Sequence, residues 1–184
     1  MDIFTAIDTR SSSLKLVEPG PTREQIERLL AAAARAPDHG KLAPWRFSVL
    51  EGNARVALGD AMADALRAKK PDVSDAQLAA ERGKPLRAPT IIAVAAHLTR
   101  GHKVPEHEQV QATAAAVQNM FLAAHALGLG AMWKSGPATE SPIVKKAVGF
   151  DADDIVVAFL YLGTNAIAGP QRTPTLAGLV KWMR

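Results

Sequence analysis

Apolar residues recur at helical spacing in the segment that precedes Pro37. They form a stripe that consists of Ile26, Leu29, Leu30, Ala33 and Ala34. Thr22 is a favourable N-cap residue, and Gln25 completes a capping box with it, so the pattern predicts a helix that begins at this threonine. Pro37 is expected to end the helix, because a proline disfavours helical geometry at the residue before it.

Strand patterns follow further along the chain. Two nearly continuous apolar runs, at 90–96 and 155–162, are typical of strands that are covered on both faces of a sheet. The segment 45–50 alternates between apolar and polar residues and also predicts a strand. We expect 14–19 to be extended, 131–135 to form a short strand, and the Gly-Thr pair after 162 to end the last strand.

The longest helical stretch, residues 106–127, is rich in alanine and would span about 33 Å as a helix. Its residues are small on all sides, which predicts a buried helix that packs closely against others. Shorter helices are expected at 2–9, 53–66, within 71–83 and at 142–148. This order predicts an α+β fold with a mixed central β-sheet, flanking helices and one long central helix. No linker or change in composition interrupts it, so we expect a single domain over residues 1–184.

Composition and charge narrow the classes of function. The net charge is +4, but the basic residues are scattered among acids, which argues against nucleic-acid binding without excluding it. No apolar run approaches the roughly 20 residues that span a bilayer, and the N-terminal pattern is not that of a secretory signal. The chain has no cysteine, which excludes structural disulfides, thiolate metal sites and a cysteine nucleophile. We therefore expect a cytoplasmic protein.

Several standard catalytic and binding motifs are missing or incomplete. The segment 128–133 begins like a dinucleotide fingerprint, but a tryptophan replaces its third glycine and it follows a helix. Neither a P-loop nor a nucleophile elbow occurs, and Gln111 stands where a zincin needs its second histidine. His102 and His107 lie near acids, but a solvated loop explains them better than a metal site, and we predict no metal.

Three segments have chemistry suited to a phosphate-bearing ligand. The run Arg10-Ser11-Ser12-Ser13 supplies a cation and hydroxyls directly after a helix, which is a combination that phosphate requires. The run 35–39 places Arg35, an aspartate and His39 around a proline. The run Trp133-Lys134-Ser135 places a cation and a hydroxyl at the end of a strand. Each segment alone is a weak signal.

Taken in order, these segments resemble the nitroreductase family of FMN enzymes, in particular its small bacterial subgroup. The resemblance runs from near residue 1 to about 165. Further matching text consists of Glu18-Pro19, Pro21-Thr22, Pro44-Trp45, Arg87-Ala88-Pro89, His102-Lys103-Val104-Pro105, Thr139-Glu140-Ser141-Pro142 and Phe159-Leu160-Tyr161-Leu162-Gly163-Thr164. The order and spacing of these short motifs together make the resemblance fairly specific.

The resemblance implies a nitroreductase-like fold and a homodimer that binds two FMN molecules at its interface. The cofactor-binding residues it implies are Arg10, Ser11 and Ser12 at the phosphate and ribityl chain, Trp133, Lys134 and Ser135 from the same subunit, and Arg35 and His39 from the other subunit. Ser11 and Lys134 depart from the family pattern, because an arginine is expected at each position. Lysine keeps the charge but loses the bidentate fork, which would lower phosphate affinity.

The implied activity is reduction of nitroaromatics, quinones or similar small acceptors with electrons from NAD(P)H in a ping-pong cycle. FMN carries the chemistry, so no side chain is assigned as a catalytic base or nucleophile. Alternatives that the sequence leaves open are another flavin enzyme on the same scaffold, such as a dehalogenase or flavin-modifying enzyme, and a non-enzymatic FMN-binding module. A lid near 67–85, which has no recognisable motif, would set the choice of acceptor.

Overall fold

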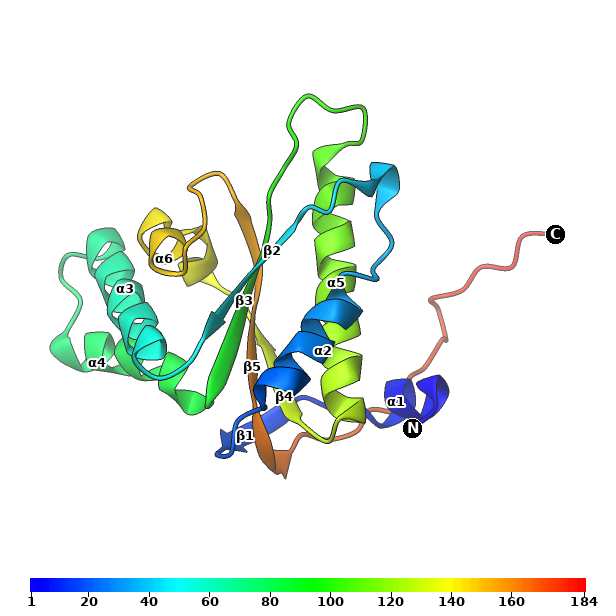
Figure 1. Cartoon of the computed structure of the whole chain (residues 1–184), viewed down its shortest axis with the longest axis horizontal. Coiled ribbons are helices and arrows are strands. Elements are labelled where there is room, and N and C mark those ends of the chain that lie inside the picture. Colours follow the sequence, from blue (N-terminus) through cyan, green and yellow to red (C-terminus); the bar gives the residue numbers. More distant parts are fainter.

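The computed structural model describes all 184 residues, and its centre is a five-stranded sheet (Figure 1). The strand order is β1-β5-β3-β2, and β4 also pairs with β5. The strands are β1 Ser13–Val17, β2 Trp45–Leu50, β3 Thr90–Ala96, β4 Gly130–Lys134 and β5 Ile155–Ala168. The predicted segments β2 and β3 coincide with those observed.

The predicted α+β class is confirmed, but the sheet is antiparallel at every pairing rather than mixed. The number of connecting helices does not decide this, because β2 and β3 are joined by two α-helices and β4 and β5 by one, and both pairs are antiparallel. Strand direction depends on how the connecting segments pack and is not visible in the residues of the strands themselves.

Helices cover both faces of the sheet (Figure 1). The helices are α1 Ile3–Thr9, α2 Arg23–Ala33, α3 Asn53–Lys69, α4 Asp75–Gly83, α5 Glu106–Ala126 and α6 Pro142–Ala147. Three short 3₁₀ turns are η1 His39–Lys41, η2 Pro85–Arg87 and η3 Pro137–Glu140. Helices α2 and α5 lie against one face, α3 and α6 lie against the other, and α4 packs on α3.

Alternation along the central strands divides the core into two layers. Ile92 and Val94 of β3 face α2 and α5, whereas Ile91 and Ala93 face α3 and α6. Every residue of β3 is buried, as expected for a strand that is covered on both faces. The sheet therefore carries an apolar core on each side.

Local signals account for the starts of α2 and α4. The predicted capping box of α2 is present, with reciprocal hydrogen bonds between Thr22 and Gln25, and α4 has the same arrangement at Ser74. Helix α3 begins at Asn53, and the residue in the capping position before it is Gly52, with φ +50°. Strand β5 continues six residues beyond its predicted end at 162, because β1 pairs with its second half.

Helix α5 buries one face only. Its buried residues are Gln109, Ala112, Thr113, Ala116, Val117, Met120, Phe121 and Ala124. The opposite face is exposed or half-buried, so the expected burial on all sides is wrong for a single chain. No Asp, Glu, Lys or Arg occurs from Gln109 to Leu127, which leaves this outward face almost without charge.

A buried glutamine holds the loop between β3 and α5. The Gln109 amide nitrogen donates to the carbonyls of Thr99 and Val104 at 3.2 Å each, and its amide oxygen accepts from the Thr99 N–H at 2.8 Å. These bonds satisfy backbone groups that the loop itself leaves unpaired. The N-terminal end of α5 and the loop 97–105 are thereby fixed to one another.

The segment after β5 lies away from the sheet (Figure 1) and all its residues from Pro170 are exposed. It carries large apolar side chains, of which Trp182 is 85% exposed. On α1, Phe4 is 74% exposed. None of the helices has the length and apolar character needed to cross a membrane.

Tyr161, the single tyrosine of the chain, lies in the core between the sheet and α3. Burial raises its pKa from 10.0 to about 12. An unfolded chain would release this proton near pH 10, so the stability that Tyr161 contributes is present below that pH and is lost as pH rises toward 12. We expect phenolate absorbance to appear only together with loss of the folded circular dichroism signal.

The control for this titration is Tyr161→Phe, which lacks the ionisable group and should lose less stability above pH 10. Phenolate absorbance that develops near pH 10 in a fully folded chain would contradict the prediction.

Candidate functional site

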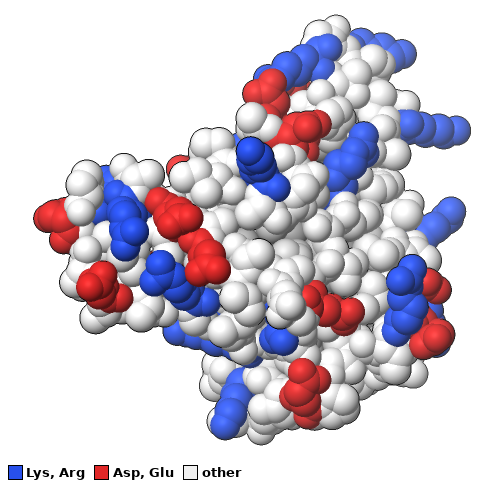
Figure 2. Space-filling model, turned by 60° about the vertical axis from the view of Figure 1, so that its left-hand side comes forward, with Lys and Arg blue, Asp and Glu red and all other residues white.

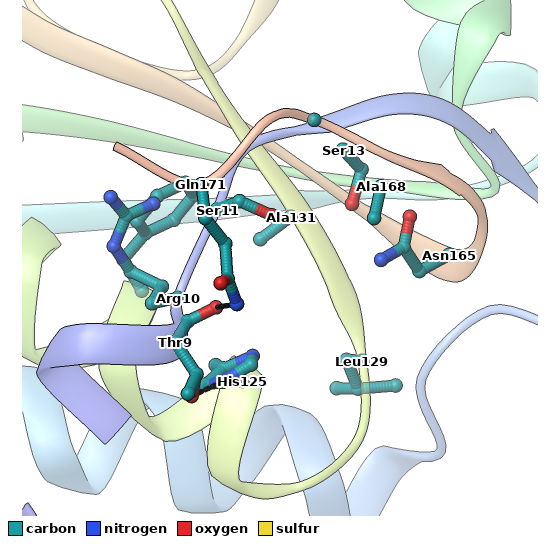
Figure 3. A pocket seen from close by; sticks show the side chains of 12 residues that line it. Thr9, Arg10, Ser11, Ser13, His125, Leu129, Ala131, Asn165, Ala168 and Gln171 are labelled. Carbon is teal, nitrogen blue, oxygen red and sulfur yellow. Dashed lines mark hydrogen bonds between the residues drawn. The ribbon is translucent and has the colours of Figure 1, made fainter. Parts of the chain in front are cut away.

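A pocket of about 330 Å³ opens where the end of α1 meets the C-terminal end of α5 and the end of β5 (Figure 3). Its walls consist of Thr9, Arg10, Ser11, Ser13, Phe121, His125, Leu129, Ala131, Asn165, Ala168, Gly169 and Gln171. Asp2 caps the start of α1, and the helix ends at Arg10, whose N–H still donates to the Ala6 carbonyl. The chain then turns extended into β1 and leaves the arginine at the pocket.

The Arg10 guanidinium is the main electrostatic feature of the pocket. Its carbon lies 4.6 Å from the centre of the Phe121 ring, and its Nη1 is buried without a hydrogen-bond partner. Arg10 forms no ion pair, and burial lowers its pKa. Because burying one nitrogen of a cation without a partner is costly, this half-buried group indicates a place for an anion that the protein does not itself supply.

The three serines after Arg10 do not share one environment. Ser11 and Ser13 line the pocket, and the buried Ser13 Oγ has no hydrogen-bond partner. Ser12 is exposed and does not line the pocket, and its carbonyl accepts from the Gly169 N–H at 2.9 Å. Alternation along an extended chain explains this, because residues two apart point to the same side. That spacing is also the signal that could have added Ser13 to the predicted residues.

His125 ties α5 to α1 at the pocket wall. The Thr9 hydroxyl lies 2.6 Å from the Thr5 carbonyl, to which it donates, and 2.8 Å from His125 Nε2. Because the hydroxyl has one proton, Nε2 must donate to it, which fixes the protonated nitrogen of the ring. His125 is therefore satisfied by hydrogen bonding, and it lies at the pocket wall rather than in the core.

Two amide side chains of the pocket were not foreseen from sequence. Asn165 lies in the second half of β5, and Gln171 follows that strand and donates to the Thr9 carbonyl at 3.5 Å (Figure 3). Both lie more than 150 residues from Arg10 along the chain. No local motif marks them, because only the pairing of β1 with β5 brings them to this place.

Trp133, Lys134 and Ser135 lie along the strand that leads away from the pocket. Ala131 lines the pocket near the start of β4, and Lys134 lies three residues further, about 10 Å along an extended strand. Trp133 is half-buried, and its indole N–H donates to the Val157 carbonyl at 3.3 Å. Lys134 and Ser135 are exposed. The Arg10 segment and the Trp133 segment thus lie beside each other at one edge of the sheet, but they do not line one pocket.

His39 and Arg35 lie elsewhere. His39 is in η1, where its Nδ1 lies 2.6 Å from Oε2 of Glu108, in the first turn of α5. Phe121 of the pocket lies 13 residues further along this helix, which corresponds to about 20 Å. Arg35 is exposed just beyond α2 and forms no ion pair. A single chain does not bring His39 to the Arg10 pocket.

The histidines and acids around 102–108 do not converge on one point. Glu106 pairs with Arg100 at 3.3 Å and Glu108 pairs with His39, while the His102 ring accepts from the Val104 N–H at 3.1 Å. These partners account for the local charges without a metal.

Another group of possible metal ligands was invisible in the sequence. His97, Asp151 and Asp154 have ligand atoms within 4.8 Å of one another. The buried Asp154 carboxylate is already bonded on both oxygens, to His97 Nδ1 at 2.7 Å and to the Asp151 N–H at 3.0 Å. These bonds tie the end of β3 to the start of β5, which is a structural role.

The chain is similar along most of its length to members of one protein family. The model of the Nitroreductase family matches residues 7–164. YdjA of Escherichia coli K12, named as a candidate NAD(P)H nitroreductase, is 42% identical over 180 residues and covers 95% of this chain and 97% of its own. A Haemophilus influenzae protein with a similar name is 36% identical over 166 residues and covers 90% of this chain and 89% of its own.

Solved structures show the same fold. A nitroreductase-like family protein from Bacillus cereus superposes with a TM-score of 0.82 at 26% identity, over 100% of this chain and 96% of that one. A candidate nitroreductase from Desulfovibrio desulfuricans, solved in complex with FMN, superposes with a TM-score of 0.77 at 27% identity, over 100% of this chain and 98% of that one. The predicted nitroreductase-like fold is therefore confirmed.

Replacing Arg10 with methionine tests whether the pocket is built for an anion. Methionine removes an unpaired buried charge but also the contact of the cation with Phe121, so the free energy of unfolding should change by less than about 1 kcal/mol. Inorganic phosphate should raise the melting temperature of the original chain, because a ligand that binds only the folded state stabilises it, but not that of Arg10→Met.

Arg23→Met is the matched control, since Arg23 is exposed and pairs only with Glu27. An equal phosphate response in all three proteins would contradict an anion site at Arg10.

Proposed function

The chain belongs to the nitroreductase family, and from this premise we propose that it is an FMN-dependent oxidoreductase that passes electrons from NAD(P)H to nitroaromatics, quinones or similar small acceptors. Members of the family are oxidoreductases, so an enzymatic role follows from membership itself. The identity of the cofactor, the donor and the acceptors belongs to the proposal.

The observation that carries the proposal is the unpaired guanidinium of Arg10. Its buried Nη1 and the unpartnered Ser13 Oγ face a pocket with no carboxylate beside the cation. A phosphate group fits this donor set, because it accepts several hydrogen bonds and neutralises the charge. The FMN complex of the Desulfovibrio relative supports assigning that phosphate to FMN. We propose that Arg10 and Ser11 hold the phosphate end, with Ser13 added from the structure and without Ser12, which does not line the pocket.

The remaining residues would hold the rest of the cofactor. Trp133, Lys134 and Ser135 lie further along the same sheet edge, in the direction in which an elongated molecule could extend from the pocket. When bound, FMN supplies the capacity to accept a hydride and release electrons. The chain's own contribution is to orient the cofactor and to place positive charge near it. No side chain is proposed as a base or nucleophile.

We further propose that two chains form a homodimer and complete each site together. His39 lies about 20 Å from the Arg10 pocket along α5, so it would reach a flavin held by another chain. The outward face of α5 has almost no charge, and the exposed apolar residues of α1 and the C-terminal segment add to the uncharged surface. Such surfaces are typical of subunit contacts.

A nucleic-acid-binding role is less well supported. Figure 2 shows basic side chains interleaved with acidic ones over the visible face, with no continuous basic stripe. A role of that kind would need clustered positive charge along one face. The cytoplasmic location stays a prediction from the sequence.

The test of the proposed cofactor and donor is the visible spectrum of the purified protein. We expect flavin absorbance bands that bleach when NADPH or NADH is added without oxygen and return when a quinone or nitroaromatic is added. Steady-state kinetics should be of the ping-pong type. Bands that persist with both nucleotides would favour a binding module, and a protein that takes up no FMN would overturn the proposal.

The shared site is tested by mixing two defective chains. In a dimer of Arg10→Met with His39→Ala, one site carries both changes and the other carries neither. At an FMN concentration too low to occupy the weakened sites of either variant alone, random mixing should therefore restore FMN binding to about a quarter of all sites, because half of the dimers are mixed and each has one intact site. A site built within one chain would show no recovery. Light scattering establishes the dimer itself, and mixing either variant with itself is the control.

A further inference from the structure

An ion-paired histidine lies at the far end of α5 from the Arg10 pocket. His39 Nδ1 and Glu108 Oε2 are 2.6 Å apart, although the two residues are 69 positions apart in the chain. Figure 1 shows η1 beside the N-terminal end of α5, which is the contact that brings them together. We propose that Glu108 is a positioning residue that orients His39 for the flavin of the partner chain. This inference rests on the proposed function.

The pair contributes little to holding the loop in place. The His39 side chain is 65% exposed and that of Glu108 is 34% exposed, and ion pairs at such positions add little to stability. The loop has other attachments. The Asp38 carboxylate accepts from the Ala43 N–H at 2.7 Å, and Val104 lies so close to Gly40 that a side chain there would be only 2.9 Å from its methyl group. Glu108 is therefore expected to affect the orientation of the imidazole and not the position of the loop.

The backbone of this loop gives an independent reason to look for function. Lys41 and Ala43 have φ of 55° and 45°, in the left-handed region that residues with a side chain rarely adopt. Such conformations cost free energy and concentrate at sites where they serve ligand binding. The strained stretch lies directly after His39, so the structure holds this residue in place at a cost that the fold does not otherwise explain.

The hydrogen bond also decides which ring nitrogen is available. A carboxylate only accepts, so His39 Nδ1 carries the proton that the bond shares with Glu108. Nε2 is then the nitrogen left for a ligand. Without Glu108 the exposed ring could rotate and exchange the proton between its nitrogens. Each alternative would lower the fraction of chains ready to bind, which weakens the observed affinity by that fraction.

The experiment measures the dissociation constant of FMN by its fluorescence change on the flavin-depleted full chain. Glu108→Ala is expected to weaken binding about tenfold, whereas Glu108→Gln, which retains an oxygen that accepts from Nδ1–H, should stay within about threefold. In the His39→Ala background, Glu108→Ala should cause no further loss, because its effect passes through His39. Partial rescue by glutamine and loss of the effect without His39 are results that a general structural role would not produce.

Glu106→Ala is the matched control. Glu106 lies in the same first turn of α5 and also pairs with a basic side chain, Arg100, so its replacement removes the same helix-end charge without touching His39. Its FMN affinity should equal that of the original chain. Thermal unfolding of Glu108→Gln and Glu106→Ala verifies that both are folded.

The outcomes separate this proposal from the one on which it rests. An original chain that binds no FMN overturns the proposed function and this inference with it. If the original chain binds FMN, two results overturn only the role of Glu108. One is that Glu108→Ala binds FMN as tightly as the original chain. The other is that Glu108→Ala weakens FMN binding as much in the His39→Ala background as it does in the original chain.

Discussion

Backbone hydrogen bonds along β5 place three of the other four strands, since β1, β3 and β4 all pair with it. The strand is buried along most of its first half, where unpaired peptide groups would be costly, so this pairing has to be complete. Gly130 and Gly163 are direct partners at the point where β1, β4 and β5 meet. A side chain on Gly163 would lie 2.7 Å from Pro89, and one on Gly130 would lie 2.8 Å from Ser13 Oγ. The close approach that Gly130 allows places Ser13 and Asn165 at the pocket wall.

Helix α5 separates the two groups of predicted ligand residues. Its C-terminal end contributes Phe121 and His125 to the Arg10 pocket, while its N-terminal end holds His39 through Glu108. Within one chain the helix separates them by about 20 Å. The proposed two-chain site would let both groups contact one cofactor. The nearly uncharged outward face of the same helix suits such a contact.

Two features reduce the stability of the isolated chain, and both concern residues assigned to cofactor binding. Arg10 is half-buried with its Nη1 unpaired, and the segment after His39 contains two strained residues. In other segments the residue types favour the structure that the chain adopts there, as in the capping boxes of α2 and α4. Local conflicts within an otherwise consistent structure are typical of functional sites. Arg10 lies in one of the motifs that carried the family resemblance, and the two strained residues lie between two others, 35–39 and Pro44-Trp45.

The sequence by itself determined those helices and strands that are specified by residues close together in the chain. Thr22 with Gln25 marked the start of α2, and the apolar run at 90–96 marked β3, because caps and burial periodicity depend on neighbouring residues. The motifs around Arg10, His39 and Trp133 identified the family in the same way. Only the tertiary structure decided that the sheet is antiparallel, that β5 runs on to Ala168, and that Ser13, Asn165 and Gln171 join Arg10 while Ser12 does not. Only it paired Glu108 with His39. These facts follow from contacts between segments far apart in the chain, and no local pattern encodes which segments will meet.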